Sequence, residues 1–269
     1  MQATILIVAG SDPTGGAGMQ ADLKTLTAIG VYGAAAVTCI TVQNSRGVTR
    51  VEPLSPALVR EQIESVLADH QVTHIKIGMV GTGEIAGAVA RLLTDFPGQV
   101  IYDPVMVATT GQNLAAPSAL DGIRSLLDIT TVLTPNWPEL AVLTASEING
   151  VLEAQGAAKS LLQRFDRLRA VLVKGGHGGR GPEITDYLVL RTSEDIKIIP
   201  ATHARLDSRN THGTGCTLAS AYAAFHCLTN DDESAFQDSV AFLQTVLVRS
   251  AAARTIKHAG GRGPLLHYR

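Results

Sequence analysis

Short aliphatic runs alternate with segments of helical periodicity along most of this 269-residue chain. The first run, at 3–10, ends in glycine and leads through SDPTGGAG into a helical pattern at 19–30. Because parallel strands need a long crossover between them, this alternation predicts a mostly parallel sheet. Runs that are continuously aliphatic indicate strands buried on both faces. We therefore predict an α/β fold with helices on both faces of a central sheet, with further strands at 34–43, 74–80, 99–105, 130–136 and 168–179.

The remaining patterns complete this architecture. Two short runs at 183–190 and 195–201 indicate a hairpin, and the last third is expected to be helical, over 213–227 and 232–255. Other helices are expected at 57–70, 82–96, 118–129, 137–144 and 154–165. The chain contains no linker, low-complexity stretch or internal repeat, so we expect a single domain over residues 1–269.

Composition excludes several classes of function. Hydrophobic residues make up 45% of the chain and aromatic residues only 4%, which predicts an aliphatic core. A net charge of −2 without basic clusters argues against nucleic acid as a partner. No charge-free apolar run reaches the length of a membrane span. Three cysteines do not form a disulfide framework, so we expect a reducing compartment, the cytoplasm.

Polar and glycine-rich residues recur where the predicted strands end. In an open parallel sheet, ligands bind beyond the carboxyl ends of the strands. We therefore expect a site built from several loops along one edge: Gly10 to Asp12, Gln43 and Asn44, Gly78 and Met79, Asp103 and Pro104, Pro135 and Asn136, and Lys174 to Gly176.

The segment NTHGTGC at 210–216 leads directly into an apolar, alanine-rich helix. The backbone N–H groups at such a helix start bind anions, and glycines allow a phosphate to approach. The alternative is ordinary tight packing of a loop on a helix. Cys216 lies at the helix start, which lowers a thiol pKa, so a thiolate could take a proton from a substrate hydroxyl. Alternatively, Cys216 is only a small buried residue.

Four other polar groups allow two interpretations each. Asn136 and Glu139 have the spacing of Mg²⁺ ligands on one helix face, but also that of a capping box. Asp103 is a turn acceptor or part of a cation–phosphate site. Lys174 is a phosphate ligand or a solvated strand end. Gln43 either pairs with the edge of a heterocycle or is structural. The dinucleotide fingerprint and the Walker A pattern are both missing, which argues against NAD and against a P-loop enzyme.

Taken together, these motifs resemble the hydroxymethylpyrimidine/phosphomethylpyrimidine kinases of thiamine biosynthesis, in the ribokinase-like superfamily. The matching segments follow the family's order over nearly the whole chain, and NTHGTGC with VQN separates them from the sugar kinases. They are AGSDPTGGAGMQADLKT, VQNSRGV, KIGMV, DPVM, TPNWPE, VLVKGGH, NTHGTGCTLASA and GRGPLLH.

The resemblance implies a three-layer ribokinase-like fold and ATP-dependent phosphorylation of 4-amino-5-hydroxymethyl-2-methylpyrimidine, followed by a second phosphorylation to the diphosphate. It implies that Gln43 reads the aminopyrimidine edge and that Asp22 is the acidic residue of the pocket. The residues implied to shape the pocket are Gly10, Ala17, Met79 and Val105.

The same resemblance assigns the phosphate end of the site. Lys174, with Thr211 and His212, is implied to bind ATP phosphates, and Asp103, Asn136 and Glu139 to position Mg²⁺. The implied anion hole, with Cys216 as proton acceptor or orienter of the substrate hydroxyl, is Gly213, Thr214, Gly215 and Cys216. A homodimer is also implied, and assistance by a monovalent cation such as K⁺ is left open.

The sequence departs from the family pattern at Thr109-Thr110-Gly111, where many members have Lys-Ser-Gly. A phosphate contact from that lysine is therefore not carried over, and a weaker second transfer is conceivable. Two rival functions are a pyridoxal kinase on the same scaffold and a pyrimidine-binding protein without activity. The amide of Gln43 favours the aminopyrimidine over pyridoxal.

Overall fold

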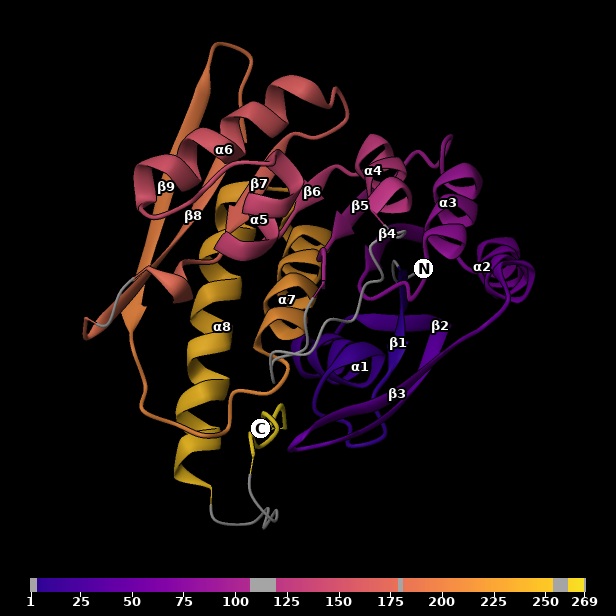
Figure 1. Ribbon diagram of the computed structural model, residues 1–269, viewed down its shortest axis with the longest axis horizontal. Helices are drawn as coiled ribbons and strands as arrows, with labels where there is room; N and C mark the ends of the chain where they lie inside the picture. Colours follow the sequence, from indigo (N-terminus) through magenta and orange to yellow (C-terminus); the bar gives the residue numbers. More distant parts are fainter. Residues whose placement is uncertain (1–3, 107–119, 179–180, 254–260, 269) are drawn as a thin grey trace.

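The structure, a computed structural model, describes residues 4–106, 120–178, 181–253 and 261–268. Thr109 to Gly111 lie outside these ranges. The strands in them are β1 (Thr4–Ser11), β2 (Tyr32–Asn44), β3 (Gly47–Pro53), β4 (Val72–Ile77), β5 (Gln99–Tyr102), β6 (Val132–Leu133), β7 (Ala170–Val173), β8 (Glu183–Arg191) and β9 (Ile196–Ala204). They form one sheet in the order β3-β2-β1-β4-β5-β6-β7-β8-β9 (Figure 1). In this spatial order, the strands from β2 through β1, β4, β5 and β6 to β7 all run parallel. At the two sides of the sheet, β3, β8 and β9 each pair antiparallel with a neighbour.

Helices cover both faces of the sheet (Figure 1). One layer contains α1 (Gly18–Ile29), α7 (Thr214–Thr229) and α8 (Asp232–Ala252), and the other contains α2 (Pro56–Asp69), α3 (Gly83–Leu92), α4 (Leu120–Ile129), α5 (Trp137–Thr144) and α6 (Val151–Arg164). Successive side chains of β1 point to opposite faces: Leu6 and Val8 pack in the core under α2–α6, and Ile5 and Ile7 in the core under α1, α7 and α8. The predicted mostly parallel sheet between two helical layers is therefore confirmed.

The edges of the sheet show what the sequence patterns predicted and what they missed. The expected hairpin is confirmed, because β8 and β9 pair antiparallel from Glu183–Ala204 to Arg191–Ile196. Strand β3 was not predicted. It is an edge strand in which only Gly47 and Val48 are buried, so it has no aliphatic run. No helix in the described ranges is long and apolar enough to cross a membrane.

Two buried histidines lie at the amino end of β4, where it packs on α7. The Nε2 atom of His74 lies 2.9 Å from Nδ1 of His226, and both residues are buried. Burial, reinforced by positive charge at His226 and Arg169, lowers the pKa of His74 to about 4. His74 therefore stays neutral in the folded protein under mildly acidic conditions.

We expect the free energy of unfolding to fall as the pH drops from 7.5 to 5. A histidine in the unfolded chain has a pKa of about 6.5 and takes up a proton in this range, which buried His74 does not, so acid favours the unfolded chain. For His74 the expected loss is about 2 kcal/mol. Urea unfolding at both pH values measures it, and His74→Gln should reduce the difference. An unchanged pH dependence in that variant would contradict the assignment.

Candidate active site

The site lies at the carboxyl ends of the parallel strands. Here the backbone ladder continues past the last strand residues, with Gly78 N donating to Val8 O at 2.9 Å and Lys174 N donating to Pro135 O at 3.0 Å. Asp103 N likewise bonds to the last residue of β4. These bonds fix the residues that leave each strand in neighbouring positions along one edge, as the sequence predicted.

Lys174 lies between two buried carboxylates. Its Nζ atom is 2.9 Å from Asp103 Oδ1 and 3.3 Å from Glu139 Oε2. Burial alone would lower the pKa of Lys174, but the two carboxylates outweigh it and raise the pKa above its usual value. Burial raises the pKa of Asp103, but the charges of Lys174 and Lys76 outweigh it and hold that pKa below its usual value. Lys174 is thus a fixed cation held inside the site, and the alternative of a solvated strand end is wrong.

Asn136 and Glu139 form a complete capping box at the start of α5. The Asn136 Oδ1 atom accepts from Glu139 N at 2.8 Å, and Glu139 Oε2 accepts from Asn136 N at 2.8 Å. The capping interpretation is therefore confirmed. The amide oxygen of Asn136 faces its own helix, which weakens its expected role as a metal ligand. Glu139 combines the cap with its contact to Lys174.

The described residues contain no group of three or more His, Cys, Asp or Glu side chains that could hold a metal. However, Asp103 Oδ2 is buried and has no hydrogen-bond partner, and Gly215 lies beside it, since a Cβ on Gly215 would be 3.6 Å from this oxygen and 3.5 Å from Lys174 Nζ. A single free carboxylate oxygen next to a cation fits a hydrated Mg²⁺ that is held mainly by substrate phosphates.

Helix α7 directs its amino end at this cluster. Gly213, at the N-cap, has φ +88° and makes no side-chain cap bond. A Cβ at this position would lie 1.9 Å from the carbonyl oxygen of Gly16, so only glycine allows the two loops to approach. The first N–H groups of α7, from Thr214 to Cys216, therefore have no capping side chain and can bind an anion.

Cys216 does not have the chemistry that its position suggested. It lies in the first turn of α7, where the sequence predicted a lowered thiol pKa. Instead, burial raises the pKa of Cys216 to about 12, against the lowering effect of Lys76, and the carboxylates of Asp22 and Asp103 raise it as well. Burial is the main reason why the helix end does not lower this pKa, and the two nearby acidic groups add to it. The side chain is a neutral thiol at physiological pH.

Asp22 is not an open acidic residue of the pocket. Both of its carboxylate oxygens lie 2.9 Å from Nζ of Lys76, and Oδ1 also accepts from Ser220 Oγ at 2.8 Å. Asp22 and Lys76 are each 0% exposed. Sequence reasoning missed Lys76. The available signal was a lysine in the middle of the aliphatic run HIKIGMV, which a buried strand tolerates only with a partner.

Three of the four residues expected to shape the substrate pocket lie near the end of β1. A Cβ on Gly10 would lie 2.7 Å from Cys39 Sγ and 3.7 Å from Met79 Sδ, so the backbone here is closely packed. Ala17 follows in the β1–α1 loop, and Ala17 N donates to Asp12 Oδ2 at 2.8 Å. Val105 is half-buried just beyond Asp103.

Gln43 and His212 lie together at this end. Gln43 Nε2 is 3.1 Å from His212 Nε2, which is also 2.9 Å from Asp12 Oδ2. These contacts join His212 to Gln43 and Asp12, at the end of the site where the sequence predicted the pyrimidine ring. Sequence spacing could not show this, since 200 residues separate His212 from Asp12. Thr211 is half-buried just before it.

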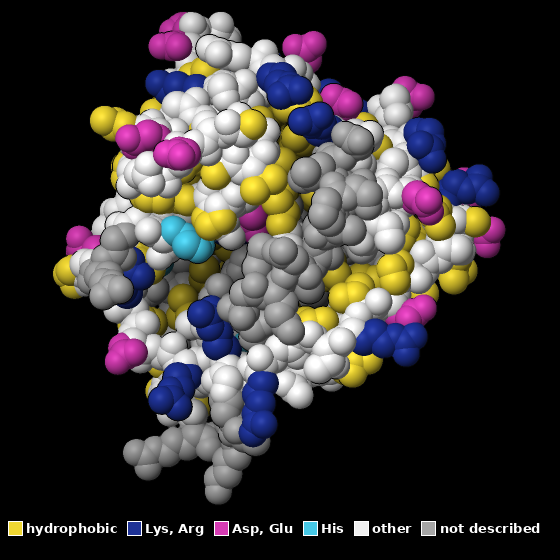
Figure 2. Space-filling model, in the orientation of Figure 1, with side chains coloured by type: hydrophobic (Ala, Val, Ile, Leu, Met, Phe, Trp, Pro, Cys, Tyr) yellow, Lys and Arg dark blue, Asp and Glu magenta, His cyan; other side chains and the backbone are white. Residues whose placement is uncertain are grey.

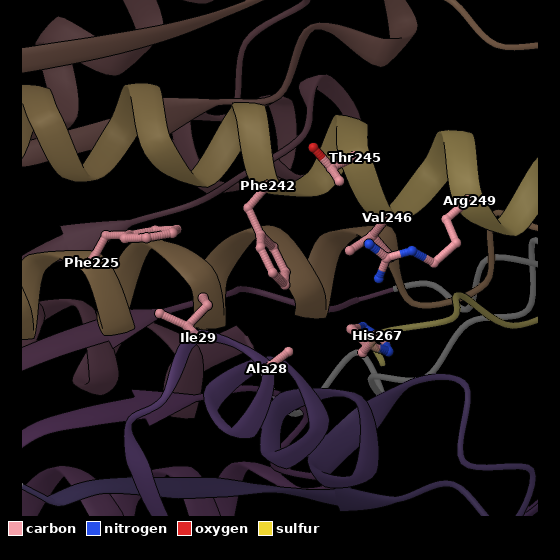
Figure 3. Close-up of a pocket in the computed structure, with 8 residues that line it drawn as sticks. All are labelled: Ala28, Ile29, Phe225, Phe242, Thr245, Val246, Arg249 and His267. Atoms are coloured by element: carbon pink, nitrogen blue, oxygen red, sulfur yellow. The ribbon is translucent and has the colours of Figure 1, made fainter. Parts of the chain in front are cut away.

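Figure 2 shows hydrophobic side chains in a recess on the face seen in Figure 1, with Lys and Arg side chains below it. A different hollow, a cavity of about 230 Å³, lies between α1, α7, α8 and the C-terminal segment (Figure 3). None of the predicted site residues lines it. Its lining is Ala28, Ile29, Phe225, Phe242, Thr245, Val246, Arg249 and His267.

Comparison with known proteins supplies independent evidence. Residues 12–264 match the family model described as phosphomethylpyrimidine kinase. A hydroxymethylpyrimidine/phosphomethylpyrimidine kinase from Rhizobium meliloti (strain 1021) is 42% identical over 269 residues, which covers 100% of this chain and 98% of the relative.

Two solved structures are similar in fold. A phosphomethylpyrimidine kinase from Clostridium difficile 630 has a TM-score of 0.78 and 32% identity, covering 91% of this chain and 100% of that chain. The pyridoxal kinase from Staphylococcus aureus in complex with AMP-PCP and pyridoxal has a TM-score of 0.85 and 27% identity, and the match covers 99% of this chain and 94% of that chain. The expected ribokinase-like fold is thereby confirmed.

Proposed function

This chain belongs to the phosphomethylpyrimidine kinase family, and from that membership we propose that it phosphorylates 4-amino-5-hydroxymethyl-2-methylpyrimidine and then the resulting monophosphate. The products are the monophosphate and diphosphate of the pyrimidine, in thiamine biosynthesis. The phosphoryl donor is ATP, as the AMP-PCP complex of the Staphylococcus aureus neighbour supports.

One observation carries this proposal: the ammonium of Lys174 is fixed by Asp103 and Glu139 directly beside the uncapped start of α7. A cation beside uncapped backbone N–H groups suits the charged oxygens of a transferring phosphoryl group. Lys174 holds the phosphate oxygens of ATP, and the N–H groups from Gly213 to Cys216 stabilise the charge in transfer. Catalysis then comes from positioning and electrostatics, because a loose phosphoryl-transfer transition state requires little proton removal by a base.

Mg²⁺ would neutralise charge on the ATP phosphates when bound. Asp103 would hold it through a coordinated water, using the oxygen that has no other partner. The family resemblance implies that Glu139 would share this role, while Asn136 contributes by capping the helix that positions Glu139.

The substrate ring lies at the other end of the site. The amide of Gln43 has donor and acceptor capacity for the aminopyrimidine edge. The pocket walls are Gly10, Ala17, Met79 and Val105, and Cys216 borders the hydroxyl as a neutral thiol. Asp22 acts indirectly, because it neutralises Lys76 below the pocket.

We expect Cys216→Ser and Cys216→Ala to keep kcat within about tenfold of the unaltered enzyme, since general-base catalysis contributes roughly 10²–10⁴-fold and a neutral thiol is not a base. Steady-state ADP release under saturating substrates at neutral pH measures kcat. Cys227→Ser, at a half-buried cysteine on the same helix, is the matched control. A loss of 100-fold or more in both Cys216 variants, with the control unaffected, would restore the role of proton acceptor.

A pyridoxal kinase is the second candidate, because the fold of the Staphylococcus aureus enzyme is so similar. The two functions are separated by the ratio of kcat/KM for the pyrimidine alcohol and pyridoxal under Mg-ATP. We expect the pyrimidine alcohol to be preferred, and Gln43→Ala to affect its KM far more than that of ATP. A clear preference for pyridoxal would overturn the proposal.

We infer three further properties: a single kinase domain over residues 1–269 and a cytoplasmic location, both from the sequence patterns, and a homodimer, from the family resemblance. Sedimentation equilibrium tests the dimer directly. A monomer at micromolar concentration would contradict it.

A further inference from the structure

A chain of polar side chains links the β1–α1 loop to Gln43. Asp12 and His212 are 2% and 6% exposed. His212 Nε2 lies 2.9 Å from Asp12 Oδ2 and 3.1 Å from the amide nitrogen of Gln43. At its other end, the Gln43 amide lies 3.2 Å from Thr41 Oγ1. The proposed transfer reaction gives no role to Asp12 or His212.

Asp12 determines whether the ring nitrogen that faces it, His212 Nε2, carries a hydrogen. Its carboxylate accepts from the backbone N–H groups of Thr14, Gly16 and Ala17 at 2.8–3.2 Å. Burial raises the pKa of Asp12, but the hydrogen bonds from His212 and Thr14 outweigh it and keep the pKa below its usual value. An ionised carboxylate only accepts, so Nε2 of His212 must carry the hydrogen.

The hydrogen on His212 Nε2 in turn fixes the orientation of the Gln43 amide. A protonated Nε2 cannot accept from an amide N–H, so the end of the amide beside His212 must be its oxygen. This requires a half-turn of the amide about its last bond. The amide nitrogen then faces Thr41, whose single hydroxyl hydrogen already goes to Ser11 O at 2.9 Å and whose oxygen is free to accept. In this orientation the hydrogen on His212 Nε2 lies between two acceptors, Asp12 Oδ2 and the Gln43 oxygen, and one amide hydrogen goes to Thr41 Oγ1. The opposite amide orientation would set two donors against each other at His212 and two acceptors against each other at Thr41.

We propose that Asp12 and His212 are positioning residues that fix the amide orientation of Gln43 and thereby its selectivity for a 4-amino over a 4-oxo pyrimidine. The inference rests on the proposed function. With its oxygen beside His212, Gln43 presents an acceptor and a donor in one fixed order. An exocyclic amine with a neighbouring ring nitrogen matches that order, and a 4-oxo ring with a neighbouring N–H requires the reverse.

The test compares kcat/KM for 4-amino-5-hydroxymethyl-2-methylpyrimidine with that for its 4-oxo analogue. We expect the unaltered enzyme to prefer the amine, and His212→Leu to reduce the preference by roughly tenfold or more. His212→Gln, which keeps an N–H donor, should restore much of it. His70→Leu is the same substitution at the histidine that ends helix α2, and it should leave the ratio of the two kcat/KM values unchanged. The KM for ATP should not move in any of these variants.

The outcomes separate the two proposals. If the unaltered enzyme does not phosphorylate the amine, the proposed function is wrong. If it does, and His212→Leu lowers kcat/KM for both pyrimidines equally, His212 is only structural and this inference is overturned. As a test without substitutions, ¹⁵N NMR of the histidine-labelled unaltered protein should show a hydrogen on His212 Nε2. A bare Nε2 would overturn the inference even if the variants failed to fold.

Discussion

Lys174→Met should lower kcat by about 10²–10³-fold, the range found when one donor to a developing charge is removed from a preorganised site. Lys174 is the cation that Asp103 and Glu139 hold beside the start of α7. Methionine keeps the length and the apolar stem but removes the charge. ADP release at saturating substrates measures the effect, with circular dichroism to confirm that the variant is folded.

The matched control for this change is Lys197→Met. Lys197 also pairs with a carboxylate, Glu233 at 2.6 Å, but its side chain is 53% exposed and it lies on strand β9. The control should retain full activity, because an exposed pair contributes little even to stability. A folded Lys174→Met enzyme with kcat within tenfold of the unaltered protein would remove Lys174 from the transfer step.

Lys76→Met should destabilise the protein by about 3–5 kcal/mol, the cost of leaving one charge of a buried pair without its partner. The Asp22 carboxylate would keep only its bond from Ser220. Burial alone lowers the pKa of Lys76, but Asp22 outweighs it and raises that pKa above its usual value. Burial also raises the pKa of Asp22, against the opposing charge of Lys76. Both carboxylate oxygens nevertheless lie 2.9 Å from the Lys76 ammonium, which is the geometry of an ion pair. Urea unfolding at neutral pH measures the loss.

A double variant separates the contribution of the two charges to stability from that of packing. Asp22→Leu with Lys76→Met replaces both charges by apolar groups and should recover most of the lost stability, since such replacements are often neutral. Arg50→Met, in the exposed pair with Glu52, should leave the free energy of unfolding nearly unchanged. If the double variant is as unstable as Lys76→Met alone, then packing rather than charge accounts for the loss.

The parts of the structure that the sequence predicted depend on local patterns. Periodicity and composition predict the layers and the hairpin, because the burial of each strand determines which residues it contains. The capping box of Asn136 and Glu139 was one of two interpretations, and it involves residues only three apart. Strand β3 was missed because an exposed edge needs no aliphatic run.

The site itself depends on contacts between distant segments. Asp22 and Lys76 are 54 residues apart, and neither side chain alone shows that they pair. The helix start at Cys216 predicted a lowered thiol pKa, but burial and the nearby carboxylates of Asp22 and Asp103 reversed it. Local patterns therefore pointed to candidate residues such as Lys174 and Asp103, whereas the partners and charge states of these residues depend on the fold.

The central claim is that one site phosphorylates both the pyrimidine alcohol and its monophosphate. The most direct measurement is a coupled assay of ADP release under Mg-ATP, with the two acceptors supplied separately and the products identified by ³¹P NMR. We expect turnover with both, giving the monophosphate from the alcohol and the diphosphate from the monophosphate, and loss of both activities in Lys174→Met. Turnover with only one acceptor or with neither, or an activity that persists without Lys174, would contradict the claim.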